Sequence, residues 1–215
     1  MDAATAVPRP RWRGRLHKAA FFVSVPAGLS LIALGSTAAA RVGAAVYAAT
    51  LTAMYAASAS LHRIDWGPRA LRRMRHLDHS MIFVMIAGTY TPFALLALRP
   101  PWSTVVLAVV WGGAALGVSV RLLADRFAVL QGTLYLVLGW IGAIVLPWAI
   151  GNLGVTGTSL MFAGGLCYTV GAVLFWLRRP VLRPDVFGYH ELWHVLVVAG
   201  SLCHYGLILY LILRG

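Results

Sequence analysis

Several polar side chains in this sequence have spacings that suit a metal site. His190 and His194 are four residues apart, and so are Ser58 and His62, so each pair would lie on one face of a helix. Two histidines at this spacing can direct ring nitrogens at one ion, and a third from a neighbouring helix adds another ligand. Three protein ligands with a fourth position left for water are the pattern of a catalytic zinc site. The sequence therefore predicts Zn2+ bound by His62, His190 and His194.

Asp78 and Ser58 are the residues predicted to act on a substrate beside this metal. The Asp78 carboxylate suits a water-holding or general-base role, and the Ser58 hydroxyl suits orienting that water or an oxyanion. The simpler alternative is that each histidine only extends its ring toward the lipid headgroups, with Asp78 paired to a nearby arginine. Three imidazoles and an acid at one membrane depth favour the metal site, because ionisable groups in membrane segments are costly.

The composition indicates that these residues lie in a membrane protein. Hydrophobic residues make up 60% and charged residues 11% of the 215 residues, against roughly 45–50% and about 25% in soluble domains. This excludes a soluble globular enzyme and, despite the net charge of +12, a water-soluble nucleic-acid-binding protein. We expect a multi-pass protein of the cell membrane whose partners are membrane lipids. Its oligomeric state is left open.

Seven apolar stretches are long enough for membrane-spanning helices, which need about 20 residues each. Lipid offers no water to backbone polar groups, so segments of this kind are helical. The predicted fold class is an all-α membrane protein, a seven-transmembrane helix bundle over 19–215 that follows a basic cytoplasmic tail, 1–18. The predicted spans are 19–40, 42–62, 78–98, 102–124, 128–148, 155–177 and 190–213.

Basic residues orient this bundle. With the N-terminus inside, fifteen of the eighteen Lys and Arg residues lie on the cytoplasmic side of the predicted spans. They are found in the tail, in the 63–77 loop and in the loops after the fourth and sixth spans. Cytoplasmic loops carry such an excess of Lys and Arg. We therefore expect the N-terminus inside and the C-terminus outside.

The same topology brings the five candidate residues to one depth, although the charge count did not use them. Ser58 and His62 end the second span, Asp78 begins the third, and His190 and His194 begin the seventh. All three of these span ends are cytoplasmic in the count. The predicted metal site therefore lies near the cytoplasmic face.

Other histidine patterns are weaker. Segment 190–194 reads His-Glu-Leu-Trp-His, which matches the short zinc-protease pattern with Glu191 as general base. No third protease ligand follows at the usual spacing. His204 lies roughly 20 Å deeper than His190 along the same helix, so we expect it to line an interior cavity or to bond a neighbouring helix. The remaining histidines, which are not predicted as ligands, are His17 in the basic tail and His76 and His79 beside Asp78.

Taken together, the motifs resemble the bacterial hemolysin III family over nearly the whole chain. That family belongs with the progestin and adipoQ receptors, which include the adiponectin receptors, and more distantly with alkaline ceramidases. Each motif alone is unspecific, whereas the set in this order is specific. The motifs are Ser58-x-x-x-His62, Leu77-Asp78-His79-Ser80, Gly88-Thr89-Tyr90-Thr91-Pro92-Phe93, and Gly188-Tyr189-His190-Glu191-Leu192-Trp193-His194 with Gly200-Ser201-x-x-His204.

This resemblance implies one zinc held by His62, His190 and His194, with Asp78 holding its water and Ser58 adjoining. Eukaryotic relatives are linked to hydrolysis of ceramide-type amides, and the bacterial members are named for haemolysis. The predicted function is a zinc-dependent hydrolase of a lipid amide or ester. The alternative is a non-enzymatic membrane-homeostasis sensor, or a channel-like or cytolytic protein, whose zinc is structural. Four protein ligands would favour that alternative, since structural zinc sites are closed.

Overall fold

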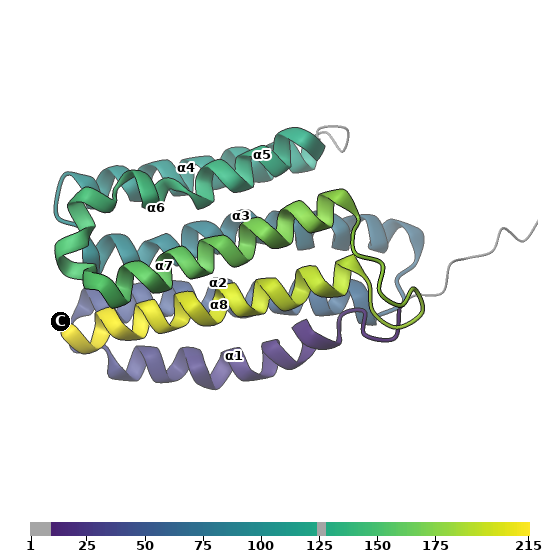
Figure 1. The fold of residues 1–215 in the computed structure, drawn as a ribbon, viewed down its shortest axis with the longest axis horizontal. Coiled ribbons are helices and arrows are strands. Elements are labelled where there is room, and N and C mark those ends of the chain that lie inside the picture. The colour runs from purple at the N-terminus through teal and green to yellow at the C-terminus, as the bar shows by residue number, and fades with distance from the viewer. Residues whose placement is uncertain (1–9, 124–127) are drawn as a thin grey trace, which may run out of the picture.

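The computed structural model describes residues 10–123 and 128–215, which form a bundle of helices lying side by side (Figure 1). No strand occurs within the described residues, where one isolated β-bridge joins Arg183 to Phe187. The helices are α1 (Arg15–Leu34), α2 (Ala38–Arg63), α3 (Pro68–Ala97), α4 (Trp102–Leu123), α5 (Ala128–Gly139), α6 (Ile141–Ile144), α7 (Leu146–Leu177) and α8 (Tyr189–Arg214).

Six of these helices are long and apolar enough to cross a membrane: α1, α2, α3, α4, α7 and α8. The predicted all-α membrane class is therefore confirmed for the described residues. The predicted fifth span, 128–148, is not one continuous helix. It is divided into α5 and α6. The two together give an apolar helical segment, Leu130–Ile144, that is shorter than the six candidate spans. The backbone leaves regular helical angles at Trp140 and Val145, whose ψ values are 5° and 4°.

Gly154 bends α7 one residue before the predicted start of the sixth span. Its φ of 56° and ψ of −167° lie in a region that glycine occupies without the steric cost a Cβ brings. A Cβ here would also come within 3.3 Å of the Tyr210 hydroxyl. Beyond this bend the rest of α7 covers the predicted 155–177 span, although the whole helix, Leu146–Leu177, counts as one candidate span.

Several helices begin earlier than the apolar pattern predicts, and two of them carry or flank candidate residues. Helix α1 starts at Arg15, so the last residues of the expected basic tail are already helical. Helix α3 starts at Pro68, because the missing N–H and fixed φ of proline suit the first helical position. Asp78 was expected to open the third span. It lies instead about three turns inside α3, held by helical backbone on both sides.

The connections that flank the candidate residues lie at one end of the bundle. Figure 1 shows the beginning of α1, the α2–α3 connection and the α7–α8 connection at this end, with the C-terminus at the opposite end. The end of α2 and the beginning of α8 therefore meet here. Helix direction thus places residues more than 100 positions apart in the chain at the same end of the bundle.

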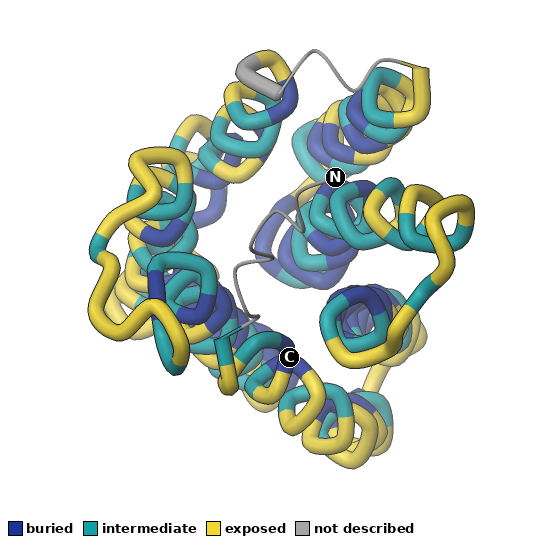
Figure 2. Tube along the Cα trace, turned by 90° about the vertical axis from the view of Figure 1, so that its right-hand side faces the viewer, coloured by how far each residue is buried: buried dark blue, intermediate teal, exposed yellow. Residues whose placement is uncertain are grey.

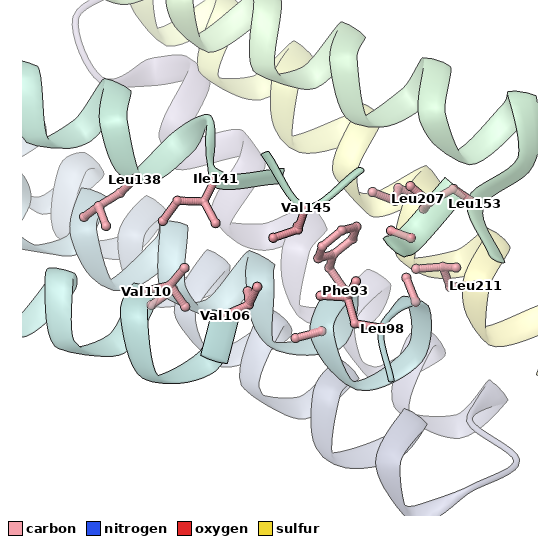
Figure 3. Close-up of a cluster of buried hydrophobic side chains, with 14 of the residues drawn as sticks. Phe93, Leu98, Val106, Val110, Leu138, Ile141, Val145, Leu153, Leu207 and Leu211 are labelled. Atoms are coloured by element: carbon pink, nitrogen blue, oxygen red, sulfur yellow. The ribbon is translucent and has the colours of Figure 1, made fainter. Parts of the chain in front are cut away.

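Two clusters of buried apolar side chains hold the helices together. One joins α3 and α4 to the α5–α7 segment and α8 around Phe93, Val110 and Leu207 (Figure 3). The other joins α1, α2 and α8 around Leu31, Tyr47 and Ile208. Figure 2 shows the buried positions facing inward between the helices and the exposed ones facing outward.

The outer surface of the bundle is apolar too. Its exposed side chains include Phe22, Leu116 and Trp176. In water such a surface would be an aggregation liability, whereas in a bilayer it contacts acyl chains. The structure and the composition therefore agree on a membrane environment.

Candidate metal centre

Three histidines converge where α2 ends and α8 begins. One ligand nitrogen from each of His62, His190 and His194 lies within 4.8 Å of the others. The His62 and His190 Nε2 atoms are 3.1 Å apart. The ring centroids of His190 and His194 are 4.8 Å apart, as expected for imidazoles four residues apart on one helix. All three predicted ligands therefore meet, and this group could hold a metal ion.

The donor set suits a transition metal. Imidazole nitrogen is a common ligand of zinc, with Zn–N bonds of about 2.0–2.1 Å, so two nitrogens on one tetrahedral zinc stand about 3.4 Å apart. The 3.1 Å separation between His62 and His190 is close to that value. Among the described residues the group contains three histidines and no carboxylate or thiolate.

Ser58 and Asp78 lie beside this group. Ser58 is buried one helical turn before His62, with 3% of its surface exposed. Its hydroxyl interacts with the Asp78 carboxylate, and the charges of His79 and Arg121 also act on Asp78. Ser58 on the metal-ligand helix α2 and Asp78 on α3 are therefore neighbours in this region. The five residues predicted from the sequence come together at one end of the bundle.

His17 is a member of the site that the sequence reasoning missed. It was placed in the basic tail without a role, yet in α1 it is only 2% exposed. Its Nδ1 lies 2.8 Å from Ser58 Oγ. Its ring stacks on His194, with centroids 3.8 Å apart and planes 15° from parallel. Helix α1 therefore contributes directly to the environment of Ser58 and of one ligand.

A signal for His17 was present in the sequence. The buried residues of α1 are His17, Ser24, Gly28 and Leu31, and spacings of seven, four and three mark one face of a helix. The charged neighbours Arg15 and Lys18 are exposed. Because of these two charged residues, the helix was expected to begin only after Lys18, and His17 was not counted on its buried face.

Glu191 is occupied by structural contacts. Its Oε2 accepts a hydrogen bond of 2.9 Å from the backbone N–H of Gly188, which caps the beginning of α8. Its Oε1 pairs with the Arg13 guanidinium. The chain before α1 is also tied to the α7–α8 loop, since Arg11 N–H donates to the Asp185 carbonyl over 3.0 Å. Both carboxylate oxygens of Glu191 are therefore used at the start of α8. This weakens the assignment of Glu191 as the general base of a protease-like site.

Comparison with known proteins decides the family. A family model described as Haemolysin-III related matches residues 5–205. Hemolysin-3 of Bacillus cereus is 35% identical over 202 residues, which cover 92% of this chain and 89% of that protein. The chain belongs to the haemolysin-III related family.

Further relatives extend the likeness. The Hemolysin-3 homolog of Bacillus subtilis (strain 168) is 30% identical over 199 residues, 90% of each chain. A plant protein, the heptahelical transmembrane protein ADIPOR1 of Oryza sativa subsp. japonica, is 28% identical over 148 residues, 60% of this chain and 39% of the plant protein. Membership of this family, together with six apolar helices, identifies a multi-pass protein of the cell membrane.

The other histidines of this haemolysin-III family member take supporting positions. His76 Nδ1 lies 3.2 Å from the Arg121 carbonyl, and His79 Nδ1 lies 2.7 Å from the Arg75 carbonyl. The Nδ1 atoms of both residues therefore contact backbone carbonyls.

His204 lies deeper in the bundle and fulfils both expectations made for it. Its Nε2 contacts the Met161 carbonyl on α7 over 3.4 Å. It also lines a small cavity of about 40 Å³ together with Tyr90, Trp140 and Phe162. That volume suits a few water molecules, since one water needs roughly 10–15 Å³ of such space. It is too small for an acyl chain.

Proposed function

We propose that this protein is a zinc-dependent hydrolase of a lipid amide or ester, with its site near the cytoplasmic face. One observation carries the proposal: His62, His190 and His194 converge in an apolar bundle, beside a buried serine that interacts with Asp78. Among the described residues the group holds three histidines and no fourth ligand, which suits a catalytic rather than a structural zinc site. Bound there, Zn2+ would supply Lewis-acid polarisation of a carbonyl group and a nucleophilic water at neutral pH.

The chain's own residues supply the remaining chemistry. The Asp78 carboxylate accepts the proton of the attacking water, as a general base does, and returns it to the leaving amine or alcohol as the C–N or C–O bond breaks. The Ser58 hydroxyl orients the reacting groups from the turn before His62. His194 and Ser58 are buried while His62 and His190 are partly buried, and partial desolvation strengthens polar interactions at the site. A substrate carbonyl would reach the site from the bilayer, because the helices that carry it are membrane-spanning candidates.

Hydrolysis by purified protein tests the proposal. Protein in lipid nanodiscs should contain about one zinc per chain and should release fatty acid from a ceramide, an N-acyl amide or an acyl ester. Removing the metal with a chelator should stop the release, and adding Zn2+ should restore it. Full zinc occupancy without hydrolysis of any of these three lipid classes would contradict the enzyme and favour the sensor with a structural zinc.

We further propose seven spans, with the α5–α6 segment completing the fifth, the N-terminus inside and the C-terminus outside. The excess of Lys and Arg at one end of the bundle supports this orientation. The likeness to a plant protein described as heptahelical supports the count.

Reporter fusions test the topology. A reporter after Gly215 should be extracytoplasmic, and one inserted within 64–67, between α2 and α3, should be cytoplasmic. A third at Ser36, between α1 and α2, should match the one at Gly215, because the two positions lie an even number of spans apart. If the 64–67 and Gly215 reporters fall on the same side, the span count is wrong by one.

A further inference from the structure

His17 links two parts of the candidate metal centre from a helix that contributes none of the predicted site residues. Its Nδ1 lies 2.8 Å from Ser58 Oγ, and its ring stacks on His194 at a centroid distance of 3.8 Å. It is not one of the three histidines whose ligand atoms converge. His17 therefore touches a ligand and a polar neighbour without belonging to the ligand set.

The donors and acceptors of Ser58 and Asp78 indicate a direction for the hydrogen bonds between His17, Ser58 and Asp78. A serine hydroxyl has one proton to donate, whereas an ionised carboxylate only accepts. Ser58 interacts with the Asp78 carboxylate, so in the ionised form that a base requires, Asp78 takes the Ser58 proton. If Ser58 donates its one proton to Asp78, the role left for His17 in the 2.8 Å contact is to donate Nδ1–H to Ser58 Oγ. A chain of donors runs from α1 through α2 to α3.

The start of α1 is built to hold His17 in this place. Gly14 precedes the helix with a φ of 73°, and a Cβ there would lie only 2.6 Å from the Cβ of His62. Arg13 pairs with the buried Glu191 at the beginning of α8. The Tyr55 and His17 rings pack in an edge-type arrangement, with centroids 5.1 Å apart and planes at 60°. The ring is therefore enclosed on several sides and has little rotational freedom.

We propose that His17 is a positioning residue of the metal site. Its Nδ1–H directs the Ser58 hydroxyl at Asp78, and its ring holds the His194 imidazole in the orientation that ligation needs. This inference rests on the proposed function for its catalytic consequence but not for its structural one. Partners of ligands and of catalytic groups typically affect metal affinity or activity by about 10–100-fold.

Three substitutions separate the two contacts of His17. His17→Phe keeps a ring to stack on His194 but has no donor for Ser58. His17→Asn keeps an amide N–H near the position of Nδ1 but has no ring. His17→Ala has neither. All three should retain about one zinc per chain, because His17 is not a ligand.

Zinc loss and hydrolysis should respond to different contacts. The rate of zinc loss to a chelator should rise by about 10-fold or more in the Asn and Ala variants and stay near wild type in the Phe variant. The kcat for lipid hydrolysis should fall by about 10–100-fold in the Phe and Ala variants and be largely rescued in the Asn variant. His17→Phe should add no further loss in a Ser58→Ala background, since it acts through that hydroxyl.

Nitrogen NMR tests the tautomer independently of catalysis. In zinc-loaded protein labelled with 15N-histidine, the His17 ring should show a protonated Nδ1 and a bare Nε2, assigned by the signals that disappear in His17→Phe. The Nδ1-protonated population should fall in Ser58→Ala. A protonated Nε2 with a bare Nδ1 in the wild type would overturn the inference, as would unchanged zinc loss in both the Asn and Ala variants. If wild-type protein hydrolyses no lipid, the proposed function fails, while NMR and zinc loss still decide the role of His17.

Discussion

Asp78→Asn should lower lipid hydrolysis by roughly 10²–10⁴-fold, the range that general-base catalysis supplies. The amide has nearly the volume of the carboxylate and can still accept a hydrogen bond from Ser58, but it cannot take a proton at neutral pH. Asp78 is also outside the group of converging ligand atoms, so zinc should stay bound. The measurements are kcat/KM on the substrate found in the lipid panel, zinc content and thermal stability.

Glu191→Gln is the matched control for Asp78→Asn, because Glu191 is the other acidic residue that could serve as a base. Both of its oxygens are engaged, by the Gly188 N–H and by Arg13. This variant should lose thermal stability, yet its hydrolysis should stay within several-fold of wild type at temperatures where it is folded. Ser58→Ala should show a milder loss than Asp78→Asn. If Asp78→Asn retains full activity and Glu191→Gln loses it, Glu191 is the base and the assignment of Asp78 is wrong.

His194→Ala and His190→Ala should each remove most of the bound zinc. Each substitution leaves the ion two of its three histidine nitrogens. His194→Ala also removes the ring that stacks against His17. Binding to the folded state at 100 times Kd stabilises by about 2.7 kcal/mol. For a chain of this size each kcal/mol corresponds to about 2–4 °C in Tm. We therefore expect zinc content to fall well below one per chain and Tm to drop by about 5–10 °C.

His204→Ala provides the control on the same helix. His204 lies ten residues after His194 and contacts the Met161 carbonyl rather than the ligand group. The His204→Ala protein should keep its zinc, so any change in its Tm reports packing alone. Full zinc occupancy in a protein with His62, His190 and His194 all replaced by alanine would disprove the site.

Much of the fold could be predicted from local composition. An apolar run of about 20 residues can be stable in lipid only as a helix that satisfies its own backbone, so α4 and most of α2 and α8 coincide with the predicted spans. The i, i+4 spacing of His190 and His194 already placed them on one face. The alternating direction of consecutive spans then placed His62 at the same end of the bundle.

The sequence was less informative where polar and apolar patterns conflict. The arginines within 69–75 suggested a loop, yet they lie inside α3, which begins at Pro68, because exposed charges are compatible with helical backbone. The predicted fifth span is mostly apolar apart from Gln131 and Thr133, and its composition did not predict the break near Trp140. Such breaks depend on neighbours: Tyr90 OH, on α3, accepts a 2.7 Å hydrogen bond from the Gly142 N–H.

The amino-acid sequence by itself determined the membrane class, the helix directions and the five residues of the candidate centre, because these follow from hydrophobicity, helical periodicity and charge asymmetry along the chain. Only the tertiary structure decided which helices are neighbours. That arrangement brings His17 of α1 against Ser58 and His194 and commits Glu191 to Arg13 rather than to the ligand group. The reason is physical: a residue's chemistry depends on partners from other helices, and packing between helices has no fixed spacing along the sequence.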